Sequence, residues 1–234
     1  MKTKCFLIVA LVSVVCFTQV LAQTRPQIRT LQFETYSRTI AIMADSIWWQ
    51  TLKKAAEDGI LDPTLINLAF PGSTVGSLNA RLKSKVPENT AIVIVAIGTN
   101  NFILLHQAPD EISGEIYALL DAVRKKAPLA KIVLQSILPT RAGDHLNQNI
   151  FELNQMLRRM AEKLSVIYWD IHGEFAEQDG LTGREDLVGN LHLTDGGRKK
   201  LYSLFVSDII ESGETASRTI WQEFSPVFDF TVER

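Results

Sequence analysis

Five short apolar runs occur at wide intervals along the chain, and each is rich in β-branched residues. They are Thr39–Ala44, Leu65–Phe70, Ala91–Ile97, Lys131–Leu138 and Val166–Ile171. None of these runs alternates cleanly between apolar and polar positions. Continuous apolar runs of this length are typical of strands that are buried on both faces, as in a parallel sheet covered by helices. The pattern therefore predicts five buried parallel strands.

The segments between these runs have the periodicity of amphipathic helices. Apolar stripes extend through residues 112–123 and 150–164, and residues 48–57 and 201–210 form two further helical segments. Strands that alternate with helices of this length imply right-handed βαβ units. We therefore expect an α/β fold, a three-layer α/β/α sandwich around a flavodoxin-like parallel sheet of five strands in the order 2-1-3-4-5.

The first residues have the layout of a secretory signal peptide. Lys2 and Lys4 precede an uncharged apolar stretch over residues 6–17, and compact residues follow as far as Ala22. The apolar stretch is too short to favour a membrane span, and an uncleaved N-terminal anchor is the alternative. We expect a signal peptide over residues 1–22, a mature chain that begins at about Gln23 without stable membrane insertion, and a secreted or periplasmic location.

Removal of this segment would also remove Cys5 and Cys16, the only cysteines in the sequence. The mature chain would then have no disulfide, no thiol nucleophile and no cysteine ligand for a metal. Its stability would come from a hydrophobic core, for which about 210 residues are sufficient. We expect one domain over residues 23–213 and an aromatic-rich extension, residues 214–234, that packs on it.

Composition and charge disfavour several classes of function. The sequence has 24 basic and 26 acidic residues, so nothing in its charge favours nucleic acid as a partner. The four histidines lack HxH or HExxH spacing, and we expect neither a metal nor a cofactor. Gly72-Ser73-Thr74 could cradle an anion, but the sequence has no Walker-type element and no Rossmann glycine triplet. A flavodoxin-like nucleotide or phosphate binder is therefore disfavoured, and the oligomeric state stays open.

Polar or glycine-containing turns follow three of the apolar runs, and the reactive groups of a parallel sheet gather at this edge. Ser46 follows the first run directly before a helix, where its hydroxyl can face solvent or simply cap the helix. Gly72 follows the second run, and its lack of a side chain lets a substrate approach its backbone N–H. Asn100 follows the third run, where its amide can serve a developing oxyanion or merely a polar turn.

His192 lies in the segment Asn190–Gly197, which leads into a basic helix with an apolar stripe. A histidine between two leucines is more often a core residue than a catalytic one. The other three histidines, His106, His145 and His172, do not lie in a segment with companions comparable to those of His192. His172 follows the fifth run, however, and it is the rival of His192 for the role of general base.

Together these segments resemble the ordered blocks of the SGNH hydrolases, the GDSL-type esterases named for Ser, Gly, Asn and His. Met43–Ile47 resembles the Gly-Asp-Ser block, with Ala44 in place of the glycine, and Asn67–Gly72 resembles the second block. Gly98–Asn101 and His192–Thr194 resemble the third and fifth blocks. The third block has the form Gly-Thr-Asn-Asn, which is similar to the form of this block in the platelet-activating-factor acetylhydrolase catalytic-subunit branch. The resemblance covers roughly residues 38–205.

This resemblance implies a serine-dependent carboxylic ester hydrolase that acts on short acyl groups such as acetyl. Ser46 would be the nucleophile and His192 its general base. The backbone N–H groups of Ser46 and Gly72 and the side-chain amide of Asn100 would form the oxyanion hole. The expected partner is a small-molecule or carbohydrate ester substrate, since exported members of such families often deacetylate carbohydrates.

The sequence departs from the family pattern at the acid of the triad. The family has an Asp three residues before the catalytic histidine, and Gly189 occupies that position here. Three arrangements stay open. In the first, Asp186, our candidate acid, or its neighbour Glu185 reaches His192. In the second, a backbone carbonyl or a water molecule orients the histidine in a Ser–His dyad. In the third arrangement, the chain is a catalytically weakened SGNH-like protein that binds carbohydrate or acyl ligands.

Overall fold

The structure is a computed structural model that describes residues 39–178 and 186–211. The predicted signal peptide and the aromatic-rich extension over residues 214–234 lie outside the described residues, as does Glu185. Within the described ranges, no helix is long and apolar enough to cross a membrane.

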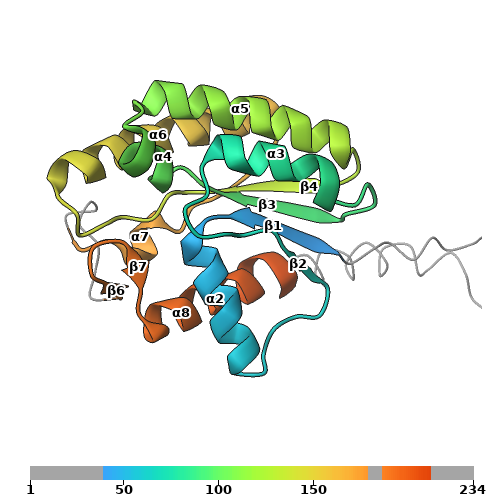
Figure 1. Ribbon diagram of the computed structural model, residues 1–234, viewed down its shortest axis with the longest axis horizontal. Coiled ribbons are helices and arrows are strands. Elements are labelled where there is room, and N and C mark those ends of the chain that lie inside the picture. Colours follow the sequence, from blue (N-terminus) through green and yellow to red (C-terminus); the bar gives the residue numbers. More distant parts are fainter. Residues whose placement is uncertain (1–38, 179–185, 212–234) are drawn as a thin grey trace, which may run out of the picture. The chain divides into compact units, whose positions relative to one another are not determined.

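A parallel sheet of five strands forms the centre of the described residues (Figure 1). Its strands are β1 (Ile40–Ala44), β2 (Leu65–Asn67), β3 (Ile92–Ala96), β4 (Lys131–Gln135) and β5 (Ile167–Trp169). They lie in the order β2-β1-β3-β4-β5, and every neighbouring pair is parallel. Each strand lies inside one of the predicted apolar runs, so the predicted sheet and its strand order are confirmed.

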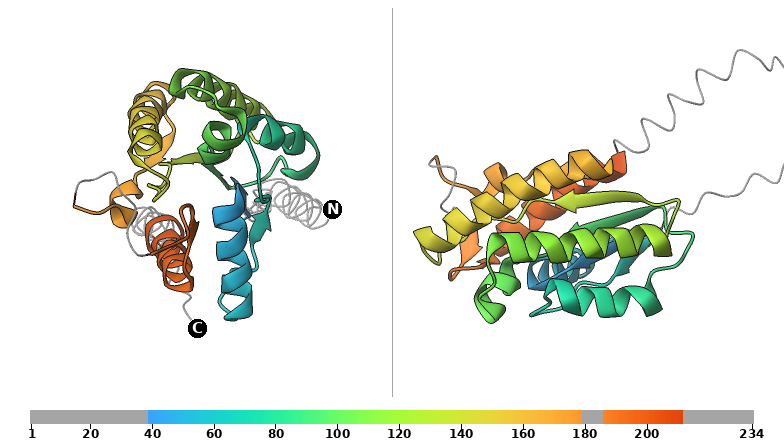
Figure 2. Two further views of the ribbon diagram at one scale, coloured as in Figure 1. Left: turned by 60° about the vertical axis from the view of Figure 1, so that its left-hand side comes forward. Right: turned by 90° about the horizontal axis from the view of Figure 1, so that it is seen from above.

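Helices cover both faces of this sheet. They are α2 (Ser46–Glu57), α3 (Val75–Lys85), α4 (Thr99–Leu105), α5 (Pro109–Lys126), α6 (Asp144–Leu164), α7 (His172–Phe175) and α8 (Asp195–Phe205), with a π-helical turn η1 (Val206–Glu211) after α8. Helices α3, α5 and α6 lie on one face, and α2 and α8 lie on the other (Figure 2). The predicted three-layer α/β/α sandwich is therefore confirmed.

Each face of the sheet has its own hydrophobic core. Met43 and Val95 are fully buried against α3, α5 and α6. Ile42 and Ile94, the preceding residues of the same two strands, are fully buried against α2 and α8. Because both faces of the strands are buried, every position is apolar and the sequence shows no alternation.

A two-stranded antiparallel hairpin lies apart from the main sheet and was not predicted. It consists of β6 (Leu187–Val188) and β7 (His192–Leu193), with Val188 paired to His192. Strands of two residues are too short to show a periodic pattern in sequence. Gly189 begins the turn with φ +60°, a conformation that glycine adopts without steric cost.

Candidate active site

Ser46 is the first residue of α2 and directly follows the carboxyl end of β1. The helix is capped by Asp45, whose carboxylate accepts a hydrogen bond of 3.0 Å from the backbone N–H of Ile47. The Ser46 hydroxyl is therefore not the capping group, and its backbone N–H has no acceptor within the helix. The local fold leaves both groups of Ser46 available at the edge of the sheet.

His192 meets Ser46 at this edge. Its Nε2 lies 3.0 Å from the Ser46 Oγ, and the imidazole is half-buried. A histidine nitrogen at this distance can accept the serine proton, which is the geometry that a nucleophile and its general base require. The structure thus brings together the two residues for which the sequence predicted these roles.

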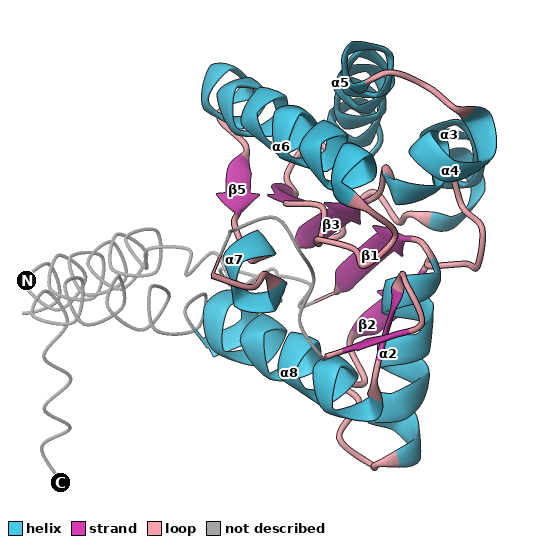
Figure 3. Cartoon of the chain, turned by 90° about the vertical axis from the view of Figure 1, so that its left-hand side faces the viewer, coloured by secondary structure: helices cyan, strands magenta, loops and turns pink. Residues whose placement is uncertain are grey.

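Two packed helices hold Ser46 and His192 in register. Helices α2 and α8 lie side by side (Figure 3). One turn below Ser46, Gln50 accepts a hydrogen bond of 2.8 Å from Arg198 Nη2 on α8. Farther along, the hydroxyl of Tyr202 donates to the backbone oxygen of Ile60 at 2.9 Å. The sequence did not predict these two hydrogen bonds, because no local pattern relates residues that lie so far apart in the chain.

His172, the predicted rival base, has a different environment. It is buried, and its Nδ1 lies 2.8 Å from the backbone oxygen of Ile137, to which it can only donate. Asn154 on α6 donates to the same oxygen at 2.9 Å. His172 therefore fastens the end of β4 to the neighbouring helices, and the histidine bonded to Ser46 is His192.

Gly72 lies in an exposed turn after β2, with φ +72°. The turn is closed by Ser73, whose N–H and hydroxyl both bond to the backbone oxygen of Phe70, at 3.2 and 2.8 Å. Among the described residues, the Gly72 N–H has no hydrogen-bond partner. This N–H is therefore available to an incoming oxygen atom.

Asn100 is the second residue of α4, at the carboxyl end of β3. Its Nδ2 donates a hydrogen bond of 2.9 Å to the backbone oxygen of Ser73. A primary amide has two N–H donors, so this bond orients the group and leaves one donor for another acceptor. The predicted oxyanion-hole residues Gly72 and Asn100 thus lie on two segments that are tied together at Ser73.

The backbone at the start of α4 requires glycine. Gly98 has φ +141°, and a Cβ atom there would lie 2.5 Å from Cδ1 of Ile137. Residues that have a side chain rarely adopt this φ, and a methyl group would require the end of the Ile137 side chain to move. Glycine therefore favours the turn from the strand into the helix of Asn100.

Asp186, the candidate acid, continues the ladder of the β6–β7 hairpin. Its backbone oxygen accepts from the N–H of Thr194 at 2.6 Å, and α8 approaches so closely that a Cβ on Gly197 would lie 2.6 Å from that oxygen. Because side chains alternate along a strand, Asp186 lies on the same face of the hairpin as Val188 and its partner His192. Diagonal neighbours on such a face are close enough for long side chains to meet.

The structure places the Asp186 carboxylate near a different partner. Its Oδ2 lies 3.9 Å from the ammonium of Lys200, with the two side chains about one-third exposed. In the part of the chain that the structure describes, Nδ1 of His192 has no hydrogen-bond partner. Asp186 therefore shares a face with His192 without a bond to it, and its role as the acid stays a prediction.

A small pocket lies next to Ser46 between the ends of β1, β3 and β4. Its lining includes Asp45, Ile47, Thr99 and Ile137, and none of the predicted site residues lines it. Burial raises the pKa of the Asp45 carboxyl from its ordinary value of 3.8 to about 6.

The described residues contain no group of three or more His, Cys, Asp or Glu side chains placed to hold a metal ion.

Comparison with known proteins identifies the family of this chain. Residues 48–200 match the GDSL-like lipase/acylhydrolase family, a range that begins just after Ser46 and contains Gly72, Asn100 and His192. Over 163 residues, the chain is 31% identical to platelet-activating factor acetylhydrolase IB subunit alpha2 of Rattus norvegicus. That alignment covers 66% of this chain and 70% of the relative. The predicted family resemblance is confirmed.

Two solved structures show the same fold at low sequence identity. A GDSL-like lipase from Bacteroides thetaiotaomicron has a TM-score of 0.64 and 17% identity, with 76% of this chain and 89% of that chain covered. A carbohydrate esterase family 3 protein from Talaromyces cellulolyticus has a TM-score of 0.52 and 16% identity, with 74% and 96% covered. These similarities support the assignment of the fold.

Proposed function

The chain belongs to the GDSL-like lipase/acylhydrolase family, and from this premise we propose that it is a serine-dependent hydrolase of carboxylic esters with short acyl groups. The observation that carries the proposal is the distance of 3.0 Å between Nε2 of His192 and Oγ of Ser46. A nucleophile held against its base at the end of a parallel sheet is equipped for acyl transfer.

In this mechanism, the Ser46 oxygen attacks the carbonyl carbon of the ester while its proton passes to His192. The carbonyl oxygen becomes an oxyanion that accepts hydrogen bonds from the N–H groups of Ser46 and Gly72 and the amide of Asn100. His192 then gives the proton to the leaving alcohol oxygen. Water hydrolyses the acyl group from Ser46 by the same route, which releases the acid and restores the enzyme.

The choice of a short acyl group rests on the similarity to platelet-activating factor acetylhydrolase IB subunit alpha2, whose name describes the removal of an acetyl group. We propose acetyl esters as the preferred acyl class, with acetylated carbohydrate among the substrates. The similarity in fold to a carbohydrate esterase and the predicted export of the chain support this choice.

For the orientation of His192, we propose that Asp186 supplies the carboxylate that the family pattern lacks at Gly189. The proposal rests on their common face of the β6–β7 hairpin. The proposal requires a change of side-chain rotamer that moves the Asp186 carboxylate away from Lys200 and toward the imidazole. A Ser–His dyad, oriented by water or a backbone group, is the alternative arrangement.

The test is hydrolysis of a p-nitrophenyl ester series, from acetate to longer acyl chains, by the purified mature chain. Ser46→Ala and His192→Ala are measured beside it. We expect acetate to be the best substrate and each variant to lose at least about a thousandfold in kcat. A wild-type rate no higher than that of Ser46→Ala would remove the hydrolase proposal.

Binding without turnover is the second candidate function. It is favoured by the absence of a partner for Nδ1 of His192 among the described residues, since an unoriented imidazole is a poor base. Calorimetric titration with acetylated oligosaccharides distinguishes the two functions. Binding to wild type with no release of acetate would support the binder and exclude the esterase for that ligand.

A further inference from the structure

A buried polar side chain lies next to the proposed oxyanion hole. Asn101 follows Asn100 on α4 and is 0% exposed. Its Oδ1 accepts a hydrogen bond of 3.1 Å from the backbone N–H of Val75, the first residue of α3. Its Nδ2 donates to Gln107 Oε1 at 2.6 Å and to Glu115 Oε2 at 3.2 Å. All of its hydrogen-bonding groups are therefore engaged.

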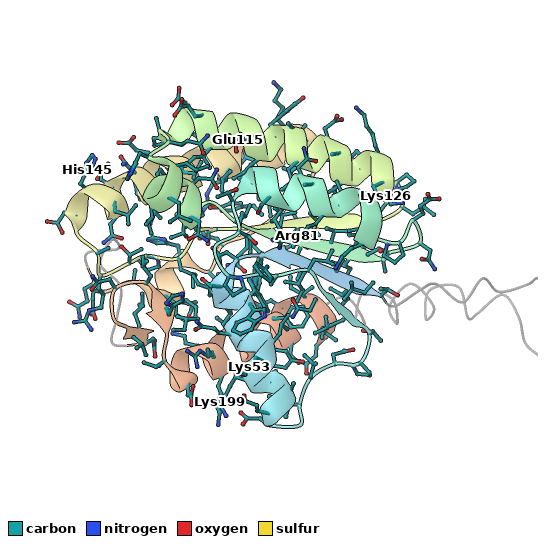
Figure 4. The ribbon with its side chains drawn as sticks, viewed as in Figure 1. Lys53, Arg81, Glu115, Lys126, His145 and Lys199 are labelled. Atoms are coloured by element: carbon teal, nitrogen blue, oxygen red, sulfur yellow. The ribbon has the colours of Figure 1, made fainter. Side chains whose placement is uncertain are left out.

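Glu115 on α5 determines which way the side-chain amides of Asn101 and Gln107 point. Glu115 also accepts from Gln107 Nε2 at 2.6 Å, so its carboxylate receives an N–H from each of two amides. A carboxylate can only accept hydrogen bonds, and it therefore turns both amide nitrogens toward itself. The Asn101 oxygen must then face the N–H of Val75. Figure 4 shows Glu115 where α4 and α5 meet.

The network joins the two segments that carry the oxyanion-hole donors. Gly72 lies on the turn that leads into α3, to which Val75 belongs, and Asn100 lies on α4. The bond from Asn100 to the Ser73 oxygen is a second tie between these segments. The separation of the Gly72 N–H and the Asn100 amide is therefore determined by the tie at Ser73 and by the network around Asn101.

We infer that Asn101, Gln107 and Glu115 are positioning residues for the oxyanion hole. They hold the loop before α3 against α4, so that the two donors meet one developing oxyanion. This inference rests on the proposed ester hydrolysis for its effect on turnover. A misplacement of about 1 Å in such a site can cost about a hundredfold in rate.

The main test variant is Glu115→Gln, which puts an amide N–H donor against the amides of Asn101 and Gln107. We expect kcat for p-nitrophenyl acetate to fall about ten- to a hundredfold with an unchanged KM, because the hole acts on the transition state. Glu111→Gln is the matched control. It makes the same change on the same helix, where Glu111 only accepts from the backbone N–H of Ala108 and glutamine can replace it.

A rescue variant separates positioning from general damage to the fold. Asn101→Asp places a second carboxylate opposite Glu115 and should lower kcat as well. The combined Asn101→Asp and Glu115→Gln variant returns the network to one carboxylate and two amides, so that the new amide nitrogen at position 115 can donate to the carboxylate at position 101. We expect kcat to recover in the combined variant, whereas additive losses would contradict the inference.

A binding measurement makes the inference testable even without turnover. The Ser46 oxygen adds to the boron of phenylboronic acid, its proton passes to His192, and a boronate oxygen occupies the oxyanion hole. We expect the Kd of phenylboronic acid to rise about tenfold in Glu115→Gln and to stay unchanged in Glu111→Gln. Gln107→Met, which removes one member of the network, should shift the Kd in the same direction and serves if Glu115→Gln does not fold.

The outcomes separate this inference from the proposed function. Wild-type turnover equal to that of Ser46→Ala removes the proposed function, and the Kd values then decide the inference alone. The inference would be overturned if folded Glu115→Gln had the same kcat and Kd as the wild type; Gln107→Met takes its place if Glu115→Gln does not fold. It would also be overturned if the wild-type chain did not bind the boronic acid, because the chain would then have no functional oxyanion hole.

Discussion

Nε2 of His192 lies 3.0 Å from Oγ of Ser46, although 146 positions separate them in the sequence. Ser46 starts α2, and His192 lies just before α8, so the packing of these two helices sets the distance. The site is therefore aligned in part by residues that take no part in the reaction, such as Arg198 and Gln50, whose hydrogen bond joins α8 to α2.

The first prediction concerns the acid. Asp186→Asn should lower kcat strongly if its carboxylate orients His192, since loss of this group in serine proteases costs about ten-thousandfold. Glu185→Gln should have little effect. Glu174→Gln is a further control, because Glu174 is the other carboxylate near Lys200, at 3.6 Å. Steady-state hydrolysis of p-nitrophenyl acetate measures all three, and an unchanged kcat in Asp186→Asn would favour the Ser–His dyad.

The second prediction restores the family residue at the hairpin turn. If no carboxylate orients His192 at present, Gly189→Asp should raise kcat, because a Cβ there meets no atom within 4 Å and the new carboxylate would stand three residues before His192. If Asp186 already has this role, kcat should not rise. The φ of +60° should cost stability of about 1 kcal/mol, although Asp tolerates this region better than most residues. Gly189→Asn controls for the backbone cost without the charge. An equal kcat in both variants would show that another group already orients His192.

The third prediction concerns Asp45 and pH. Burial raises the pKa of this carboxyl from 3.8 to about 6, so the folded chain binds its proton more tightly than the unfolded chain does. Its contribution to the free energy of unfolding should therefore fall as pH rises from 3.8 to about 6, by about 3 kcal/mol at most. Asp45→Asn keeps a residue that caps helices well, and it removes this fall in the free energy of unfolding with pH.

Urea unfolding at pH 4 and pH 7.5 measures the effect. We expect Asp45→Asn to stabilise the chain at pH 7.5 and to change it little at pH 4. Asp144→Asn, the same change at an exposed residue in the first turn of α6, should be nearly neutral at both values. A variant that loses stability at pH 7.5 would show that the Asp45 charge is compensated.

The fourth prediction concerns the glycine before α4. Gly98→Ala should destabilise the chain by about 1–3 kcal/mol and lower kcat, because the new methyl group meets Ile137 and displaces the helix of Asn100. Gly76→Ala, in α3 with open space around it, should be neutral or slightly stabilising. Adding Ile137→Val to Gly98→Ala should relieve the collision but not the strain of φ +141°. Thermal unfolding and kcat test this, and an unaffected Gly98→Ala would contradict it.

Sequence reasoning predicted the sheet because burial on both faces leaves a strong signal. The apolar runs around Ile42 and Ile94 are continuous because both faces of their strands are buried, and the alternation with helices predicted that the strands are parallel. Ser46, Gly72 and Asn100 each lie within three residues of the end of such a run, and the resemblance to the SGNH blocks predicted their roles.

Other parts of the site leave no local signal. The β6–β7 hairpin pairs only Leu187 with Leu193 and Val188 with His192, which is too short for a period to appear. The network of Asn101 and Glu115 depends on side chains that meet only after α4 and α5 have packed. A buried asparagine has the same appearance in sequence as one in an exposed turn.

The two hydrophobic cores on opposite faces of the sheet have a consequence for how this site can change. Trp48 and Leu193, which neighbour the nucleophile and the base, pack in one core, whereas Val75 and Phe102, which neighbour the oxyanion donors, pack in the other. The nucleophile and the base are thus supported by one core, and two of the three oxyanion donors, Gly72 and Asn100, are supported by the other. Substitutions near the nucleophile and the base can therefore weaken proton transfer while the oxyanion donors stay in place. An esterase scaffold can change in this way into a protein that binds acylated ligands without hydrolysing them.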